Sequence, residues 1–380
     1  MKTRWWFLGL LAIVTMAALV LSACTTAAPP TPTPTKAPPA TPPKAASEAT
    51  KPPAAAPTVP PAATPTPVPA TLNFGSVGGV GSAGVFLAID KGYFQEQGIT
   101  VKTNDFRTVA EMIAPLGTGQ LDVIGTPLST ALLAAADRGV DLKIVADHGQ
   151  SLPKWEYGWI VLRKDLAESG KVKAPADLKG MKIAIPSQGS AGDQTVQILI
   201  QQAGLGSGEV EVVVLPFAEQ AVALGNKGIA ASYTVEPFIA RGLQEGFSVK
   251  WIPNSQFFGG STQLGTVVYG PPPLKNQDLG RRWMIAYLKG VRAYGKAFSS
   301  GEGRQEAVQI LVKYSVVKEP NLYNVMEMPY LDPNGLLHKK SMDAQYKWFV
   351  DKGLYTGKKT LDDILDQSFA DFASQRLGKQ

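Results

Sequence analysis

Cysteine and histidine are almost missing from this sequence. Among its 380 residues there is one cysteine, Cys24, and there are two histidines, His148 and His338. A disulfide needs two cysteines, and metal or catalytic sites built on thiols and imidazoles need several such groups at defined spacings. We therefore expect no catalytic residue, no metal site and no cofactor. Each histidine is interpreted as a surface or core residue.

The chain also lacks a strong excess of one charge in its main part. The formal net charge is +6, but residues 1–71 contain five Lys or Arg and one Glu. This leaves 32 basic and 30 acidic residues for residues 72–380. Nucleic-acid-binding domains usually carry a marked basic surface. No nucleic-acid partner is expected.

The N-terminus combines basic residues with a long apolar run. Two basic residues precede an almost wholly apolar segment, residues 5–20, and Leu21-Ser22-Ala23-Cys24 follows. This order is typical of a secretory signal, although the run is nearly long enough for a membrane span of about 20 residues. The tetrapeptide resembles a bacterial lipobox, which implies cleavage before the cysteine and lipidation of its sulfur. We predict a signal peptide at 1–23 and a lipid anchor on the extracytoplasmic face of the cell membrane.

Proline dominates the segment that follows. Residues 25–71 contain 16 of the 30 prolines, and Val59 and Val68 are their only large aliphatic residues. Proline has no backbone donor, and such a composition buries too little apolar area to offset the entropy of ordering. We expect residues 24–71 to be a disordered, extended tether behind the anchor.

From residue 71 the pattern changes to alternating strands and helices. The stretch "TLNFGSV" reads as a strand, "VFLAIDKGYFQEQ" as a helix and "GITVKTND" as a second strand, and this alternation continues to "IAASYTVEPF". It predicts an α/β fold with largely parallel sheets. The last third is predicted to be mostly helical, over residues 278–299, 302–314, 340–352 and 361–375.

The turn after the first strand carries the motif G-x-G-x-x-G from Gly79 to Gly84, and Asp105 ends the next predicted strand. In a dinucleotide-binding domain, such glycines approach the pyrophosphate and the acidic residue holds a ribose. An extracytoplasmic enzyme that uses this loop is therefore one alternative. The other is a general ligand loop, because glycines at a helix start leave backbone N–H groups open to a ligand. We favour the second, since dinucleotides are scarce outside the cytoplasm.

Four segments carry a resemblance to a known family: Lys91–Lys102, Gly117–Asp147, Ala176–Ser190 and Val235–Phe238. In this order they resemble the solute-binding proteins of ABC importers for nitrate, taurine, alkanesulfonates, thiamine-pyrimidine precursors and riboflavin. The resemblance implies a binding protein and not an enzyme, with a small-molecule ligand and with a permease and its ATPase as partners.

The same resemblance implies a two-lobed type 2 periplasmic-binding-protein fold with two crossover strands. The lobes close over the ligand. Mapped on this chain, lobe one comprises residues 72–158 plus 265–380, and lobe two comprises residues 159–264.

The expected site lies where strands end. In open α/β sheets, ligands bind beyond the carboxyl ends of the strands, next to helix N-termini. Residues there present backbone groups, hydroxyls, amides and carboxylates: Gly79, Gly81, Ser82, Thr126, Ser129, Thr130, Ser187, Gln188, Gly189, Ser190, Asp193, Tyr233 and Glu236. Aromatic residues near the crossovers are further candidates, and core packing is an equal alternative for each: Trp155, Tyr157, Trp159 and Phe257.

The expected ligand follows from Asp193, in the first turn of a predicted helix. A nitrate or sulfonate at this helix start would meet a like charge. Asp193 and Glu236 can accept hydrogen bonds from ring N–H, amino or hydroxyl groups, while aromatic residues stack on a flat ring. We therefore favour a heteroaromatic vitamin or precursor, such as riboflavin or a hydroxymethylpyrimidine. If Asp193 only caps its helix, an anion remains the alternative.

Overall fold

The computed structural model describes residues 68–206 and 208–380. The signal peptide, Cys24 and the tether up to residue 67 lie outside the described residues, so the predictions made for them stay predictions. In the described ranges, no helix combines the length and the apolar character that a membrane span requires.

The first sheet has the strand order β2-β1-β3-β10-β4. β1 pairs in parallel with β2 and β3, whereas β10 runs antiparallel to both β3 and β4. The strands are β1 Ala70–Ser76, β2 Ile99–Asp105, β3 Val123–Thr126, β4 Lys143–Ser151 and β10 Thr262–Tyr269.

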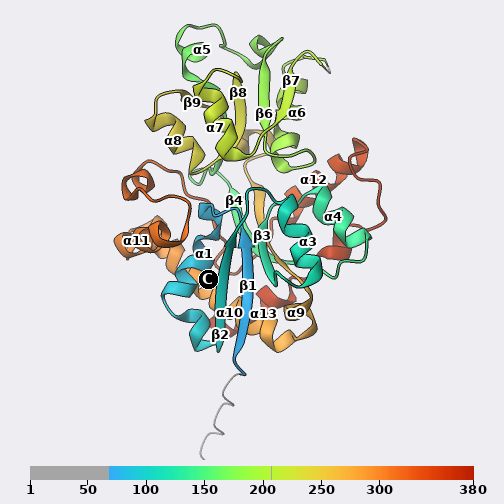
Figure 1. Cartoon of the computed structure of the whole chain (residues 1–380), viewed down its shortest axis with the longest axis vertical. Coiled ribbons are helices and arrows are strands. Elements are labelled where there is room, and N and C mark those ends of the chain that lie inside the picture. The colour runs from blue at the N-terminus through green and yellow to red at the C-terminus, as the bar shows by residue number, and fades with distance from the viewer. Residues whose placement is uncertain (1–67, 207) are drawn as a thin grey trace, which may run out of the picture. The chain divides into compact units, whose positions relative to one another are not determined.

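The second sheet repeats this arrangement with the order β7-β6-β8-β5-β9. β6 is parallel to β7 and β8, and β5 is antiparallel to β8 and β9. Its strands are β5 Gly158–Arg163, β6 Lys182–Ile185, β7 Glu211–Val214, β8 Ala231–Val235 and β9 Ser248–Pro253. The expected α/β fold with two lobes is confirmed (Figure 1). Each sheet is mixed, because the strand that the chain enters from a crossover, β10 or β5, runs antiparallel to both of its neighbours, while the other four strands run in one direction.

Two short segments connect the lobes. The chain leaves β4 through residues 152–157 to reach β5, and it returns from β9 through residues 254–261 to β10. The return segment begins with a short 3-10 helix, η3, over Asn254–Phe257. The exact lobe limits at residues 158 and 264 stay predictions.

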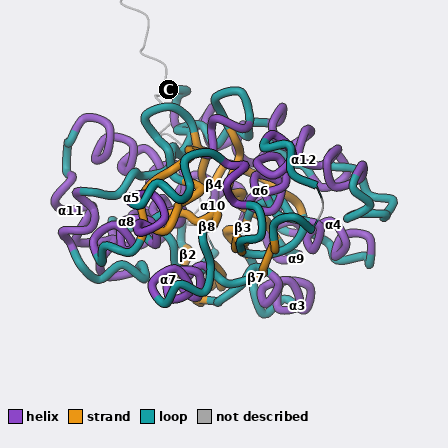
Figure 2. The backbone as a smooth tube through the Cα atoms, turned by 90° about the horizontal axis from the view of Figure 1, so that it is seen from above, coloured by secondary structure: helices purple, strands orange, loops and turns teal. Residues whose placement is uncertain are grey.

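Helices surround the sheets, and Figure 2 shows the strands inside and helices outside them. In the first lobe they are α1 Ala83–Asp90, α2 Tyr93–Glu96, α3 Ala110–Thr118, α4 Thr130–Asp137, α9 Pro271–Lys275, α10 Gln277–Gly295, α11 Arg304–Tyr314, α12 Lys339–Asp351 and α13 Ser368–Leu377. In the second lobe they are α5 Lys164–Glu168, α6 Ala191–Gln202, α7 Phe217–Gly225 and α8 Phe238–Gln244.

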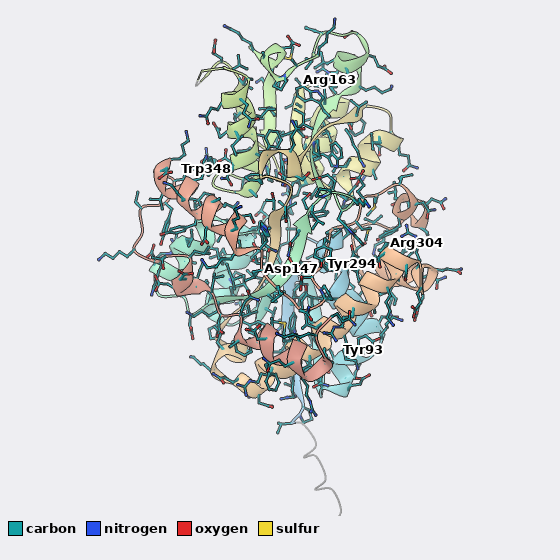
Figure 3. The ribbon with its side chains drawn as sticks, turned by 180° about the vertical axis from the view of Figure 1, so that it is seen from behind. Tyr93, Asp147, Arg163, Tyr294, Arg304 and Trp348 are labelled. Atoms are coloured by element: carbon teal, nitrogen blue, oxygen red, sulfur yellow. The ribbon has the colours of Figure 1, made fainter. Side chains whose placement is uncertain are left out.

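Helix α10 organises the core of the first lobe. Its N-cap, Asn276, accepts a hydrogen bond from the Leu279 N–H at 3.1 Å. Its inner face buries Trp283 and Tyr287, whose rings stack at 5.2 Å, and the Tyr287 hydroxyl donates to the Asp147 carbonyl at 2.6 Å. Figure 3 shows Asp147 in the middle of the molecule. The helix therefore anchors β4, the strand that leads to the crossover.

The C-terminal helix differs from its prediction. In place of one helix over residues 361–375, a 3-10 turn over Asp362–Ile364 precedes α13. Between them Leu365 forms a parallel bridge with Ile144 of β4, and the Asp366 N–H donates to the Ile144 carbonyl at 2.9 Å. Pairing with a sheet edge requires extended backbone, so the helix stops there.

A candidate ligand-binding site between the lobes

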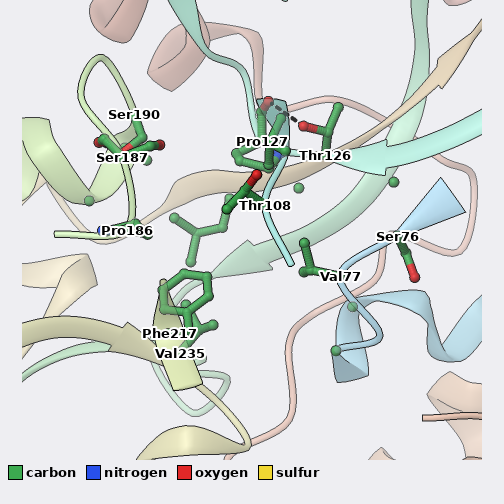
Figure 4. A pocket seen from close by; sticks show the side chains of 18 of the residues that line it. Ser76, Val77, Thr108, Thr126, Pro127, Pro186, Ser187, Ser190, Phe217 and Val235 are labelled. Carbon is green, nitrogen blue, oxygen red and sulfur yellow. Dashed lines mark hydrogen bonds between the residues drawn. The ribbon is translucent and has the colours of Figure 1, made fainter. Parts of the chain in front are cut away.

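A cavity of about 330 Å³ is lined by residues of both lobes. Figure 4 shows Thr126, Pro127 and Thr108 of the first lobe facing Pro186, Ser187, Ser190 and Phe217 of the second. The lining follows the carboxyl ends of β1, β2 and β3 and of β6, β7 and β8. This is the edge at which open α/β sheets bind ligands.

Nine of the predicted site residues line this cavity. They come from segments up to 157 residues apart and meet because each lies near the carboxyl end of a strand or in a crossover: Gly79, Gly81, Ser82, Thr126, Tyr157, Ser187, Ser190, Tyr233 and Glu236. The buried Tyr233 keeps its phenolic proton, since burial raises the pKa of that group.

The other predicted residues within the described ranges lie outside the lining: Ser129, Thr130, Trp155, Trp159, Gln188, Gly189, Asp193 and Phe257. Several have local partners instead. The Ser129 hydroxyl caps α4 by accepting from the Leu132 N–H at 3.3 Å. The Thr130 N–H donates to the Gly189 carbonyl at 3.1 Å and so links the two lobes beside the cavity.

The aromatic candidates divide between the cavity and the core. Tyr157 lines the cavity, whereas Trp155 packs edge-on against Tyr330 at 6.1 Å. Trp159 donates from Nε1 to the Glu156 carbonyl at 3.0 Å. Phe257 packs against the core of the second lobe.

Asp193 shapes the loop before α6. Its Oδ2 accepts from the Gly189 N–H at 2.9 Å, and its own N–H donates to the Ser190 hydroxyl at 3.2 Å. Burial raises the pKa of this carboxyl. Asp193 thus acts on the cavity through the position of Ser190.

Other lining residues were not among the predicted ones. Arg107–Ala110 follow β2, and Pro216 and Phe217 follow β7, so the strand-end rule could have found them. His148, Leu264 and Gly265 lie within β4 and β10, where no local pattern marks a site.

The charged groups of the lining are neutralised or already paired. Arg107 forms an ion pair with Glu219 across the lobes. Glu236 accepts from the Ala240 N–H at 2.9 Å and from the Glu327 N–H at 3.2 Å, and burial raises its pKa to about 7. Burial lowers the pKa of His148 to about 4, so its imidazole is neutral at neutral pH.

Aromatic and aliphatic side chains form most of the remaining wall. Phe217 and Phe238, at the starts of α7 and α8, stack with their ring centroids 5.8 Å apart and their planes 20° apart. Val77, Val109 and Leu264 line the cavity from the first lobe. Such a wall suits the face of an apolar or aromatic molecule.

The G-x-G-x-x-G segment has a packing explanation. A Cβ on Gly84 would lie 2.7 Å from the Val291 side chain and 3.0 Å from that of Tyr287, both on α10. A Cβ on Gly81 would lie 3.2 Å from the His148 carbonyl oxygen. These glycines allow α1 to approach α10 and the loop to approach β4.

Comparison with known proteins places this site in context. Residues 80–255 match the family model described as NMT1/THI5 like. A protein of Brucella abortus strain 2308, whose name assigns it only a binding role, is 24% identical over 238 residues, which cover 62% of this chain and 68% of that protein.

Solved structures share the fold at low sequence identity. The nitrate-binding protein of Synechocystis PCC 6803 has a TM-score of 0.68 at 15% identity, with 83% of this chain and 91% of that chain covered. The ligand-binding component of an ABC-type import system from Staphylococcus aureus, with zinc bound, has a TM-score of 0.66 at 15% identity, covering 80% and 99%. The aliphatic sulphonate-binding protein of Escherichia coli has a TM-score of 0.63 at 18% identity, covering 80% and 99%.

Proposed function

Because the chain belongs to the NMT1/THI5-like family of solute-binding proteins, we propose that its cavity takes up a flat, neutral heteroaromatic molecule for delivery to an ABC importer. The chain is a binding protein and not an enzyme. The family match therefore favours a binding protein over the dinucleotide-enzyme alternative, and the glycine motif has the packing role described above. The importer's permease and ATPase are the proposed partners.

The character of the cavity wall is the observation that carries this proposal. Its lining is largely aliphatic and aromatic, and Arg107 is paired with Glu219. Both carboxylate oxygens of Glu236 are engaged by backbone N–H groups. The lining offers Ser and Thr hydroxyls to any polar ligand, but a nitrate or sulfonate would also need a free cation to offset its desolvation. A neutral ring needs only apolar faces and a few hydrogen bonds.

A ligand panel on the purified protein tests the proposal. We expect riboflavin or a hydroxymethylpyrimidine to raise the melting temperature, since a ligand at 100 times its Kd stabilises the folded state by about 2.7 kcal/mol. Taurine, an alkanesulfonate and nitrate at the same concentration should leave it unchanged. A rise with taurine or nitrate alone would support the anion importer in place of the vitamin importer.

We propose further that Cys24 is lipidated and holds the protein at the outer face of the cell membrane. The support is the sequence Leu-Ser-Ala-Cys after the apolar run. Cys24→Ser should release the mature protein into the soluble fraction or leave an uncut leader. Fractionation followed by mass spectrometry measures both. A variant that is processed and partitions like the parent would contradict the anchor.

A further inference from the structure

His148 is a buried polar residue at the wall of the cavity. Only 6% of its surface is exposed, and its Nε2 has no hydrogen-bond partner among the described residues. Buried polar atoms are nearly always paired, because burial removes the hydrogen bonds that they make with water. A partner from outside the chain would satisfy this ring.

Three glycines from separate elements make room for the imidazole. A Cβ on Gly125 of β3 would lie 2.5 Å from Cε1 and 2.6 Å from Nε2 of His148. A Cβ on Gly265 of β10 would lie 3.3 Å from Nδ1, and one on Gly81 would lie 3.4 Å from it. All three glycines also line the cavity. These three positions next to the ring therefore carry no side chain, and this leaves room for the imidazole.

We propose that His148 binds the ligand directly, through a hydrogen bond between its imidazole and a ring nitrogen, ring N–H or carbonyl of a neutral heteroaromatic molecule. This inference rests on the proposed function and assigns a specificity-determining residue to it.

The state of the imidazole determines which ligand it selects. As burial lowers the pKa of His148 to about 4, the ring carries one N–H donor and one acceptor at neutral pH. A rotation of 180° about the Cβ–Cγ bond exchanges Nε2 with Cε1, and either nitrogen can then meet a polar ligand edge. A neutral ring supplies no countercharge for nitrate or a sulfonate. The neutral imidazole therefore favours an uncharged ligand group that donates or accepts a hydrogen bond.

Substitutions in the full-length protein test this role. His148→Phe keeps a flat ring and removes both hydrogen-bonding nitrogens, while His148→Gln keeps a donor and an acceptor. We expect His148→Phe to weaken binding of riboflavin or hydroxymethylpyrimidine about tenfold, and His148→Gln to retain part of the affinity. Gly125→Ala should also weaken binding, because its Cβ would displace the ring. His338→Gln is the matched control, since His338 lies outside the cavity lining.

A spectroscopic readout separates ligand contact from a structural role. In protein labelled with 15N-histidine, the same probe should shift the ring nitrogens of His148 and leave those of His338 in place. If a ring probe binds the parent and His148→Phe with equal Kd, the role of His148 is overturned and the proposed function stands. If neither riboflavin nor hydroxymethylpyrimidine binds the parent, both the role of His148 and the proposed function are overturned.

Discussion

Phe217 and Phe238 give the cavity its stacked aromatic wall, and both are the first residues of their helices. Phe257 is a useful contrast, because it is half-buried against the core of the second lobe and lies outside the cavity lining. The two kinds of phenylalanine should therefore respond differently to truncation.

Phe217→Ala should weaken the binding of a ring ligand about tenfold, through lost contact area and lost stacking. Titration of the intrinsic fluorescence with riboflavin measures the Kd. Phe257→Ala, the control, should lower the melting temperature and leave the Kd unchanged. An equal loss of affinity in both variants would show that Phe217 acts only through the fold.

The raised pKa of the Glu236 carboxyl makes the stability of the protein depend on pH. Its pKa rises from 4.5 to about 7 in the folded chain, chiefly because burial disfavours the charged form. Between these pH values the unfolded chain has lost the proton and the folded chain retains it. The free energy of unfolding therefore falls as pH rises through this window, by about 3 kcal/mol at 1.36 kcal/mol per pH unit. Above pH 7 this contribution is constant.

Glu236→Gln should remove this part of the pH dependence. We expect the fall in melting temperature between pH 4.5 and 7 to be smaller in the variant than in the parent. Some dependence should remain, because burial also raises the pKa of Asp147 to about 7. Calorimetry across this pH range measures the difference. Glu168 is exposed, so Glu168→Gln should show the same melting temperature against pH as the parent. If the melting temperature of Glu236→Gln falls with pH as steeply as that of the parent, burial of Glu236 does not cause the dependence.

At the scale of elements, Glu156 ties the two crossovers together. It lies in the first crossover and is buried, and its Oε1 accepts from the Ser151 hydroxyl at 2.5 Å and from the Ser255 N–H at 3.0 Å. The Ser255 hydroxyl, in η3 of the second crossover, donates to its other oxygen. The two connections between the lobes thus share one carboxylate.

Glu156→Gln should destabilise the protein by about 2 kcal/mol, because hydrogen bonds to a charged group contribute about 1.5–3 kcal/mol. Urea unfolding followed by tryptophan fluorescence measures the loss. Glu211→Gln, on exposed β7, is the control and should stay within about 0.5 kcal/mol of the parent. Equal urea midpoints for the Glu156 variant and the parent would show that the tie contributes nothing.

At the scale of the whole described unit, polar contacts beside the cavity are among those that join the lobes. The Arg107–Glu219 ion pair joins the loop after β2 to α7, and the Thr130 N–H donates to the Gly189 carbonyl. Side-chain exposures of 74% and 44% mean that water screens the ion pair, so it contributes about 0–1 kcal/mol. Contacts of this strength can hold the lobes together without preventing ligand release.

Arg107→Gln should favour separation of the lobes. We expect a larger radius of gyration in small-angle scattering of the ligand-free protein and a Kd that depends less on salt, since the screened pair is gone. Lys347→Gln removes an exposed ion pair with Asp351 inside one helix and serves as the control. If Arg107→Gln has the same radius of gyration as the parent and the control, the Arg107–Glu219 ion pair does not hold the lobes together.

Sequence patterns alone were enough to predict the fold class and much of the cavity. Alternating apolar strands and helices favour layered α/β lobes, and carboxyl ends of neighbouring parallel strands share one edge. Local patterns were therefore enough to select Gly79, Thr126, Ser187 and Tyr233, which line the cavity. The family resemblance added the two crossovers, which strand patterns alone did not reveal.

Which residues of β4, β10 and the crossovers line the cavity could be read only from the three-dimensional structure. Successive strand residues alternate between faces, and each register shift reverses which residues face a given side. β4 and β10 pair with shifts on both sides of Gly265, beside His148. The neighbours of this ring are Gly81, Gly125 and Gly265, which lie far apart in the chain. Such a site depends on long-range pairing, which no local sequence pattern records.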